Sequence, residues 1–124
     1  MTFTRATATA VLMLRVSYGI ALIAVPRRLA LRWLGEAAND APVQVPLRGL
    51  GAREAILHAG ALLALRRGAP LRPWLAASVA GDLTDVIATA VGRRRLPAGS
   101  PLATLAVGGG SALVSVLLAG ATEQ

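Results

Sequence analysis

Four apolar stretches, each close to twenty residues long, follow one another along this chain of 124 residues. An α-helix rises 1.5 Å per residue, so about 20 apolar residues are needed to cross the hydrocarbon core of a bilayer. The stretches cover roughly residues 5–25, 47–65, 73–92 and 101–121. We therefore expect an all-α fold, a bundle of four transmembrane helices that forms a single integral membrane domain over residues 1–124.

The composition agrees with a membrane protein and argues against several other classes. Hydrophobic residues make up 55% of the chain, charged residues only 15%, and the mean hydropathy is +0.61. A soluble domain carries about 25% charged residues, and a disordered chain needs low hydrophobicity. The sequence has no cysteine, which excludes disulfides and Cys-ligated metal centres. It also has no nucleotide, haem or flavin motif, so we expect no cofactor.

The basic residues are all arginine, 13 in number, and most of them flank the apolar stretches. This placement is typical of side chains that lie among lipid headgroups, so membrane lipids are the expected partners. Aromatic residues are only 3%, which argues against a nucleic-acid partner. The Ala-, Gly- and Arg-rich composition is that of a GC-rich genome, and we expect a multi-pass protein of a bacterial inner (plasma) membrane. A small excess of arginine in the loops after the first and third stretches favours termini outside the cytoplasm.

The segment that follows the first stretch has a different pattern. Residues 27–35 are short and amphipathic, with Arg28 and Arg32 one helical turn apart. We expect a helix that lies in the membrane interface with its arginines toward the headgroups. The alternative is a continuation of the first helix, bent at Pro26. Residues 36–46, rich in Asn, Asp and Pro, are expected to form a loop.

Five ionisable residues interrupt the apolar stretches at the depth of the membrane interior. A charge at the centre of a spanning helix costs about 2.5–3.5 kcal/mol on insertion scales. Such groups should therefore face the inside of the bundle and pair with one another. They are Arg15, Glu54, His58, Asp82 and Asp85.

Helical spacing places these groups on shared faces. Glu54 and His58 are four residues apart, and so share one face of the second helix. We expect Arg15 to form an ion pair with Asp82 or Asp85 across the bundle, because ions in a low dielectric need partners. In the third helix one polar stripe at helical spacing contains Ser78, Gly81, Asp82, Asp85 and Thr89.

Two sets of candidate site residues follow from these positions. We assign acid/base or electrostatic roles in catalysis to Asp82, Asp85, Glu54 and Arg15. We assign substrate binding to His58, Tyr18, Arg48, Arg53 and Ser78. A metal site built from the carboxylates and His58 is an alternative, but the arginines already neutralise the carboxylates, and we expect no metal. A purely structural network, with Arg15 holding the helices in register, also remains open.

Two motifs carry a resemblance to a known group of proteins. Residues 48–54 read R-G-L-G-A-R-E, and residues 81–85 read G-D-L-T-D. They resemble the R-G-x-G-x-R-E and G-D-x-x-D segments of small bacterial and fungal four-helix membrane proteins, broadly DoxX-like in size and layout. The resemblance covers the second and third helices and implies no known reaction. The signature positions that it implies are Arg48, Arg53, Glu54, Asp82 and Asp85.

Three functions are compatible with these observations. The first is the binding or conversion of an apolar, lipid-like small molecule by acid/base chemistry, as in an isomerase or a cyclase, because such reactions need only proton transfer. The second is an accessory subunit of a larger membrane complex, or a homo-oligomer, which the small size and short loops favour. The third is a small proton-coupled transporter, which the positive charge of Arg15 inside the first helix disfavours.

Overall fold

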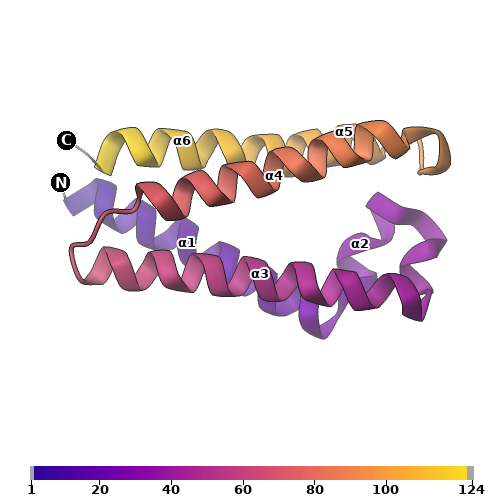
Figure 1. Cartoon of the computed structure of the whole chain (residues 1–124), viewed down its shortest axis with the longest axis horizontal. Helices are drawn as coiled ribbons and strands as arrows, with labels where there is room; N and C mark the ends of the chain where they lie inside the picture. Colours follow the sequence, from indigo (N-terminus) through magenta and orange to yellow (C-terminus); the bar gives the residue numbers. More distant parts are fainter. Residues whose placement is uncertain (1, 123–124) are drawn as a thin grey trace.

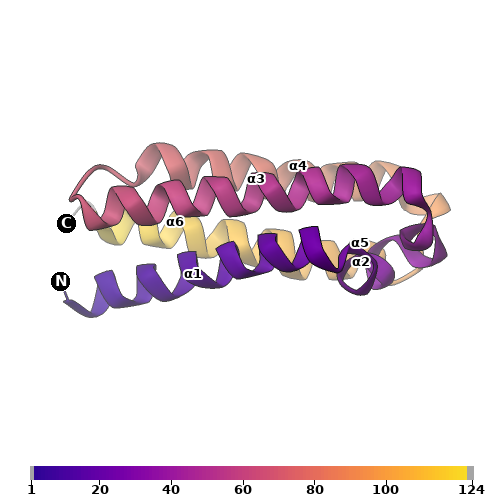
Figure 2. The same ribbon diagram turned by 90° about the horizontal axis from the view of Figure 1, so that it is seen from below.

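The computed structural model describes residues 2–122, and within these it describes the side chains of all but residues 2, 3, 103 and 122. Every regular element in residues 2–122 is helical, which confirms the all-α prediction. Figures 1 and 2 show long helices lying side by side in two layers, α1 with α3 and α4 with α6. The long elements are α1 (Thr2–Ala24), α3 (Ala41–Arg66), α4 (Arg72–Gly92) and a final rod made of α5 (Ser100–Thr104), η3 (Leu105–Gly109) and α6 (Gly110–Thr122).

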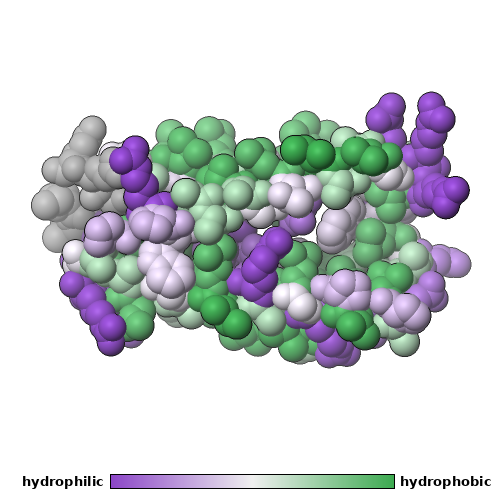
Figure 3. All heavy atoms as spheres, in the orientation of Figure 1, coloured by the Kyte–Doolittle hydropathy of each residue, from purple (hydrophilic) through white to green (hydrophobic). Residues whose placement is uncertain are grey.

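Three of these long elements have the length and hydropathy needed to cross a membrane. They are the segments Thr4–Ala24, Arg72–Arg95 and Ser100–Ala121. Figure 3 shows hydrophobic residues over much of one face, a hydrophilic group near its middle and further hydrophilic residues toward both ends. The third helix, α3, is long enough but is not among the three, because every 18-residue stretch of it carries at least three charged side chains.

A separate short helix follows α1, as the sequence predicts. The chain turns at Val25, and α2 (Pro26–Leu34) begins at the proline. Trp33 ties α2 to the second layer, because its Nε1 donates to Thr89 Oγ1 at 2.7 Å and its carbonyl oxygen accepts a hydrogen bond from Ser100 Oγ.

The prediction of a loop over residues 36–46 is wrong. The chain forms a 3-10 helix, η1 (Gly35–Asn39), and α3 already begins at Ala41. The reason is an apolar contact: Leu47 packs with Ala30 and Ala38 in a small core at this end of the molecule. Pro42 stands in the first turn, where a missing N–H costs nothing, and only Pro46 lies inside the helix.

Two glycines make a close approach between the helices of the first layer. A Cβ atom on Gly19 would lie 2.6 Å from the carbonyl oxygen of Gly51, and one on Gly51 would lie 2.6 Å from the carbonyl oxygen of Gly19. Small residues let helix backbones approach in this way in membranes. The contact sets α1 against α3 one turn from Arg15 and Glu54, and so brings their side chains within reach of each other.

The fourth apolar stretch is not one regular α-helix. Residues Leu105–Gly109 form a π-helical turn, η3, which contains the first two of three consecutive glycines. A Cβ on Gly108 would lie 3.1 Å from the carbonyl oxygen of Asp82. The glycine therefore allows the last rod to lie against α4 at the height of that aspartate.

Candidate functional site: the buried charge cluster

Arg15 is the centre of a group of side chains that we call the charge cluster, namely Arg15, Glu54, His58, Ser78 and Asp82. Its Nη1 and Nη2 donate to Asp82 Oδ2 and Oδ1 at 2.8 and 2.7 Å, a bidentate pair. Its Nη2 and Nε donate to Glu54 Oε2 at 3.0 and 3.2 Å. The expected ion pair between Arg15 and Asp82 is confirmed, and one guanidinium joins α1, α3 and α4.

The cluster is almost completely removed from solvent. The side chain of Arg15 is 12% exposed, and the side chains of Glu54 and Asp82 are each 6% exposed. Charge-assisted hydrogen bonds of this bidentate kind are the strong ones in proteins. Removing one partner of such a pair leaves a buried, uncompensated charge, which is the costly outcome.

His58 extends the cluster along the interface between α3 and α4. Its Nδ1 lies 2.7 Å from the backbone oxygen of Glu54, and its Nε2 lies 3.0 Å from Ser78 Oγ. The carbonyl can only accept, so Nδ1 carries a proton and donates to it. In neutral His58 the Nε2 therefore accepts from the Ser78 hydroxyl. Nδ1 also lies 3.5 Å from Glu54 Oε2.

The charges inside the cluster do not balance when both carboxylates are ionised. Glu54 and Asp82 contribute two negative charges and Arg15 one positive charge, while neutral His58 contributes none. Two carboxylates therefore share one guanidinium inside the cluster. Glu54 Oε1 takes part in none of the cluster's hydrogen bonds, whereas both oxygens of Asp82 are engaged.

Arg53 and Asp85 form a second pair outside the cluster. Arg53 Nη2 lies 3.6 Å from Asp85 Oδ2, and the two side chains are 45% and 29% exposed. Gly81 makes room for this guanidinium, since a Cβ there would lie 3.1 Å from Arg53 Nη2. The polar stripe on α4 therefore divides, with Asp82 facing inward and Asp85 lying at the edge between α3 and α4.

Of two further predicted binding residues, Arg48 lies away from the cluster, whereas Tyr18 lies near its charged groups. Arg48 is exposed, and its Nη1 donates to the backbone oxygen of Ile23 near the end of α1. Arg48, to which the sequence analysis assigned substrate binding, therefore lies near the end of α1 rather than beside Glu54. Tyr18 is 40% exposed on α1.

The sequence analysis did not single out Gly19, a small residue that sets the spacing between α1 and α3. It placed Gly81 in the polar stripe, but not as the residue that accommodates Arg53. One signal was present in the sequence: Gly19 follows Arg15 by four residues, one turn along the same helix face. The contact itself depends on the register between α1 and α3, which no local pattern determines.

The sequence analysis considered a metal site as an alternative, and the described side chains do not form one. Among these residues no three His, Asp or Glu side chains gather in a way that could hold a metal ion. The carboxylates that could have done so, those of Glu54 and Asp82, are bonded to Arg15 instead.

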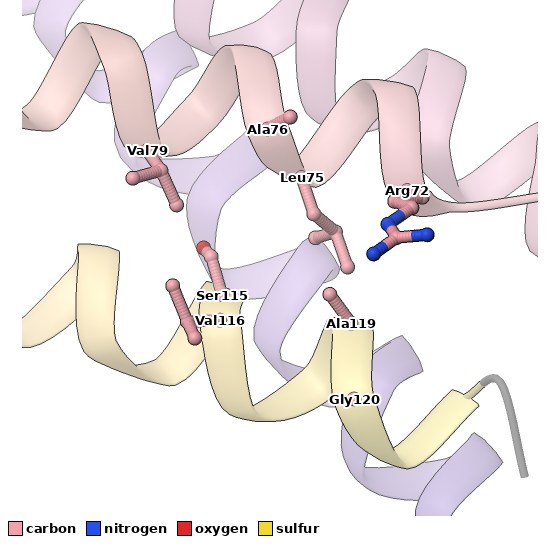
Figure 4. A pocket seen from close by; sticks show the side chains of 8 residues that line it. All are labelled: Arg72, Leu75, Ala76, Val79, Ser115, Val116, Ala119 and Gly120. Carbon is pink, nitrogen blue, oxygen red and sulfur yellow. The ribbon is translucent and has the colours of Figure 1, made fainter.

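A groove of about 480 Å³ lies elsewhere, between α4 and α6 (Figure 4). It is mostly apolar, and Figure 4 shows the Arg72 guanidinium at one end of it. None of its lining residues belongs to the charge cluster, so the groove and the cluster are separate features. The lining residues are Arg72, Leu75, Ala76, Val79, Ser115, Val116, Ala119 and Gly120.

Comparison with known proteins finds no match to this chain among family models, curated proteins or solved structures. The resemblance of residues 48–54 and 81–85 to DoxX-like proteins therefore stays a prediction. Function has to be inferred from the charge cluster and its surroundings.

Proposed function

We propose that the protein is a multi-pass membrane protein in which α1, α3, α4 and the final rod all cross the bilayer. Three of these elements are apolar enough by themselves. The charges of α3 are the obstacle, and two of them have partners: Glu54 is bonded to Arg15, and Arg53 is paired with Asp85. An all-helical bundle fits a bacterial inner membrane, since outer-membrane proteins are β-barrels.

Inside this bundle, we infer, the charge cluster binds an apolar, lipid-like molecule and converts it by proton transfer. The observation that carries this proposal is the excess of carboxylate over guanidinium in a nearly dry site. A buried carboxylate with a free oxygen is suited to be a general base. Ionisable side chains inside a membrane are also typical of functional sites.

The geometry suggests a different role for each residue. Asp82 holds the Arg15 guanidinium with both oxygens, and so positions it. Glu54 accepts a proton from the substrate on Oε1 and returns it at another atom, while Arg15 stabilises the charge that develops. His58, fixed between Glu54 and Ser78, holds the α3–α4 side of the site. The net change is an isomerisation or a cyclisation without oxidant or reductant.

The test is the variant Glu54→Gln, which keeps the shape and removes the base. Apolar extracts of cells that express wild type should contain a pair of isomers, equal in mass and different in retention, whose ratio depends on the protein. Glu54→Gln should abolish that dependence. Glu36→Gln is the matched control, because Glu36 is exposed at the far end of the molecule. Equal extracts from wild type and Glu54→Gln would exclude the catalytic role.

An accessory role in a larger membrane complex is the second candidate, favoured by one observation. The Arg53–Asp85 pair is partly exposed on a surface that faces lipid in this arrangement, where charged side chains are costly. A protein partner would cover it. Recovery of a stoichiometric second protein after purification in mild detergent would support this role, and a chain that purifies alone would count against it.

A further inference from the structure

The Arg53–Asp85 pair lies well inside the apolar part of the molecule. Asp85 is seven residues from the end of α4 at Gly92, which at 1.5 Å per residue is about 10 Å. Arg53 stands near the middle of α3, which covers Ala41–Arg66. If α3 and α4 cross the bilayer as proposed above, this pair faces hydrocarbon rather than headgroups. Such charges in membrane proteins face a protein interior or a water-filled cavity.

The surface around the pair is made of small and apolar side chains. We call it the α3–α4 face; it is formed by Arg53, Ile56, Ala77, Thr84, Asp85 and Ala88. Ala77, Thr84 and Ala88 are exposed and recur at helical spacing on α4, and Ile56 on α3 is 71% exposed. Small residues at this spacing allow close packing of helices in membranes. Figure 3 shows the surface recessed between α4 and α3 on this side of the molecule.

The α3–α4 face carries one positive and one negative side chain, Arg53 and Asp85, so two copies of the face can pair with each other. Arg53 and Asp85 lie at the same depth, because their side chains are 3.6 Å apart, and they come from neighbouring antiparallel helices. A copy rotated by 180° about an axis along the membrane normal would set its α4 against α3 at the same depth. Each Arg53 would then lie beside Asp85 of the second copy as well as its own. A two-fold interface requires this self-complementarity.

We propose that the α3–α4 face is the interface of a homodimer, in which two Arg53–Asp85 pairs meet and form a closed group of four alternating charges. The proposal rests on the membrane-spanning arrangement proposed above. It commits to a second copy of this chain, because the charges on the face are equal and opposite and need no further ion. The second copy also closes the recess between α3 and α4 from that side.

The absence of cysteine from the chain makes a direct test straightforward. In membrane vesicles under mild oxidation, Thr84→Cys should give a disulfide-linked dimer, because this position lies close to the two-fold axis. Leu117→Cys on α6 is the matched control; it is 62% exposed but lies outside the α3–α4 face, and it should stay monomeric. No linked dimer at Thr84, or a product with the mass of a different protein, would overturn the homodimer.

Charge reversal tests the four-charge group itself. In the Thr84→Cys background, Arg53→Asp makes the face negative and Asp85→Arg makes it positive. Each variant alone should lose linked dimer by at least about tenfold, because like charges then meet at the interface. Differently tagged chains of the two kinds, expressed together, should form a mixed dimer. Loss in both single variants without recovery in the mixture would show that the pair acts only within one chain.

A further experiment distinguishes a wrong dimer from a wrong membrane-spanning arrangement. Extraction of the vesicles with alkaline carbonate releases chains that do not span the membrane. A released chain would overturn the spanning arrangement and the dimer together. A retained chain without a Thr84 cross-link would overturn the dimer alone.

Discussion

Gly19 of α1 and Gly51 of α3 pack so closely that a Cβ atom on either would lie 2.6 Å from the other's carbonyl oxygen. The contact lies one helical turn from the Arg15–Glu54 bond. Because interiors are close-packed, even one added methyl group at such a point forces backbones apart. The geometry of the charge cluster therefore depends on two residues that carry no polar side chain.

The first prediction concerns this contact. Gly51→Ala should destabilise the protein by about 1–3 kcal/mol, the usual cost of overpacking, and should lengthen the Arg15–Glu54 bond. Thermal unfolding in detergent measures the loss. Gly110→Ala is the control, since a Cβ there meets nothing within 4 Å, and it should be neutral or slightly stabilising. A Gly51→Ala protein as stable as wild type would show that α1 and α3 are not held at this distance.

The features of this site that the sequence predicted share one cause. Arg15, Glu54 and Asp82 stand out because charge is rare in apolar stretches, and low dielectric leaves them few partners other than each other. The choice of Asp82 over Asp85 depends on helix rotation of a few tens of degrees. The sequence spacing put both aspartates on one stripe, and the packing against α3 then separated them into inner and edge positions.

The start of α3 shows where local signals mislead. Asn39, Asp40, Pro42 and Pro46 together indicate a loop. The chain is helical there, and Val43 in the early turns packs against the core of Ala30, Ala38 and Leu47. Asp40 accepts hydrogen bonds through its backbone oxygen from Val43 and Gln44 N–H groups, which closes the first turn. This long-range apolar contact outweighs the turn propensity.

The second prediction concerns Arg15, whose guanidinium bonds to both Glu54 and Asp82. Arg15→Met should destabilise the protein by about 3–5 kcal/mol, because it leaves two carboxylates buried without a counter-charge. The triple variant with Glu54→Gln and Asp82→Asn in addition should recover much of that loss, since no net charge then stays buried. Chemical denaturation in detergent measures both variants. A triple variant less stable than Arg15→Met would contradict the electrostatic origin of the effect.

The third prediction separates the buried serine from an exposed one. Ser78→Ala should cost about 1–3 kcal/mol, because it leaves His58 Nε2 without its hydrogen-bond partner in a buried site. Ser17→Ala is the matched control. Ser17 is exposed, and its Oγ donates only to Met13 O of its own helix, so its loss should be near zero. Equal effects of the two substitutions would show that the His58–Ser78 contact does not form.

The fourth prediction concerns the attachment of α2 to the second layer. Trp33 Nε1 donates to Thr89 Oγ1, which in turn lies 3.3 Å from Thr104 Oγ1 and donates to Asp85 O. Trp33→Phe keeps a smaller aromatic ring and removes the donor, so it should cost at least about 1 kcal/mol and raise hydrogen exchange in α2 above that in α3.

A double-mutant cycle isolates this bond from the rest of the contact. Thr89→Val should be destabilising alone, and its effect should shrink by about 0.5–1.5 kcal/mol when Phe already replaces Trp33. Thr9→Val serves as the control, because Thr9 Oγ1 donates only to Arg5 O within α1, and it should show no coupling to position 33. Strictly additive effects of Trp33→Phe and Thr89→Val would mean that the Trp33–Thr89 hydrogen bond does not tie the short helix to α4.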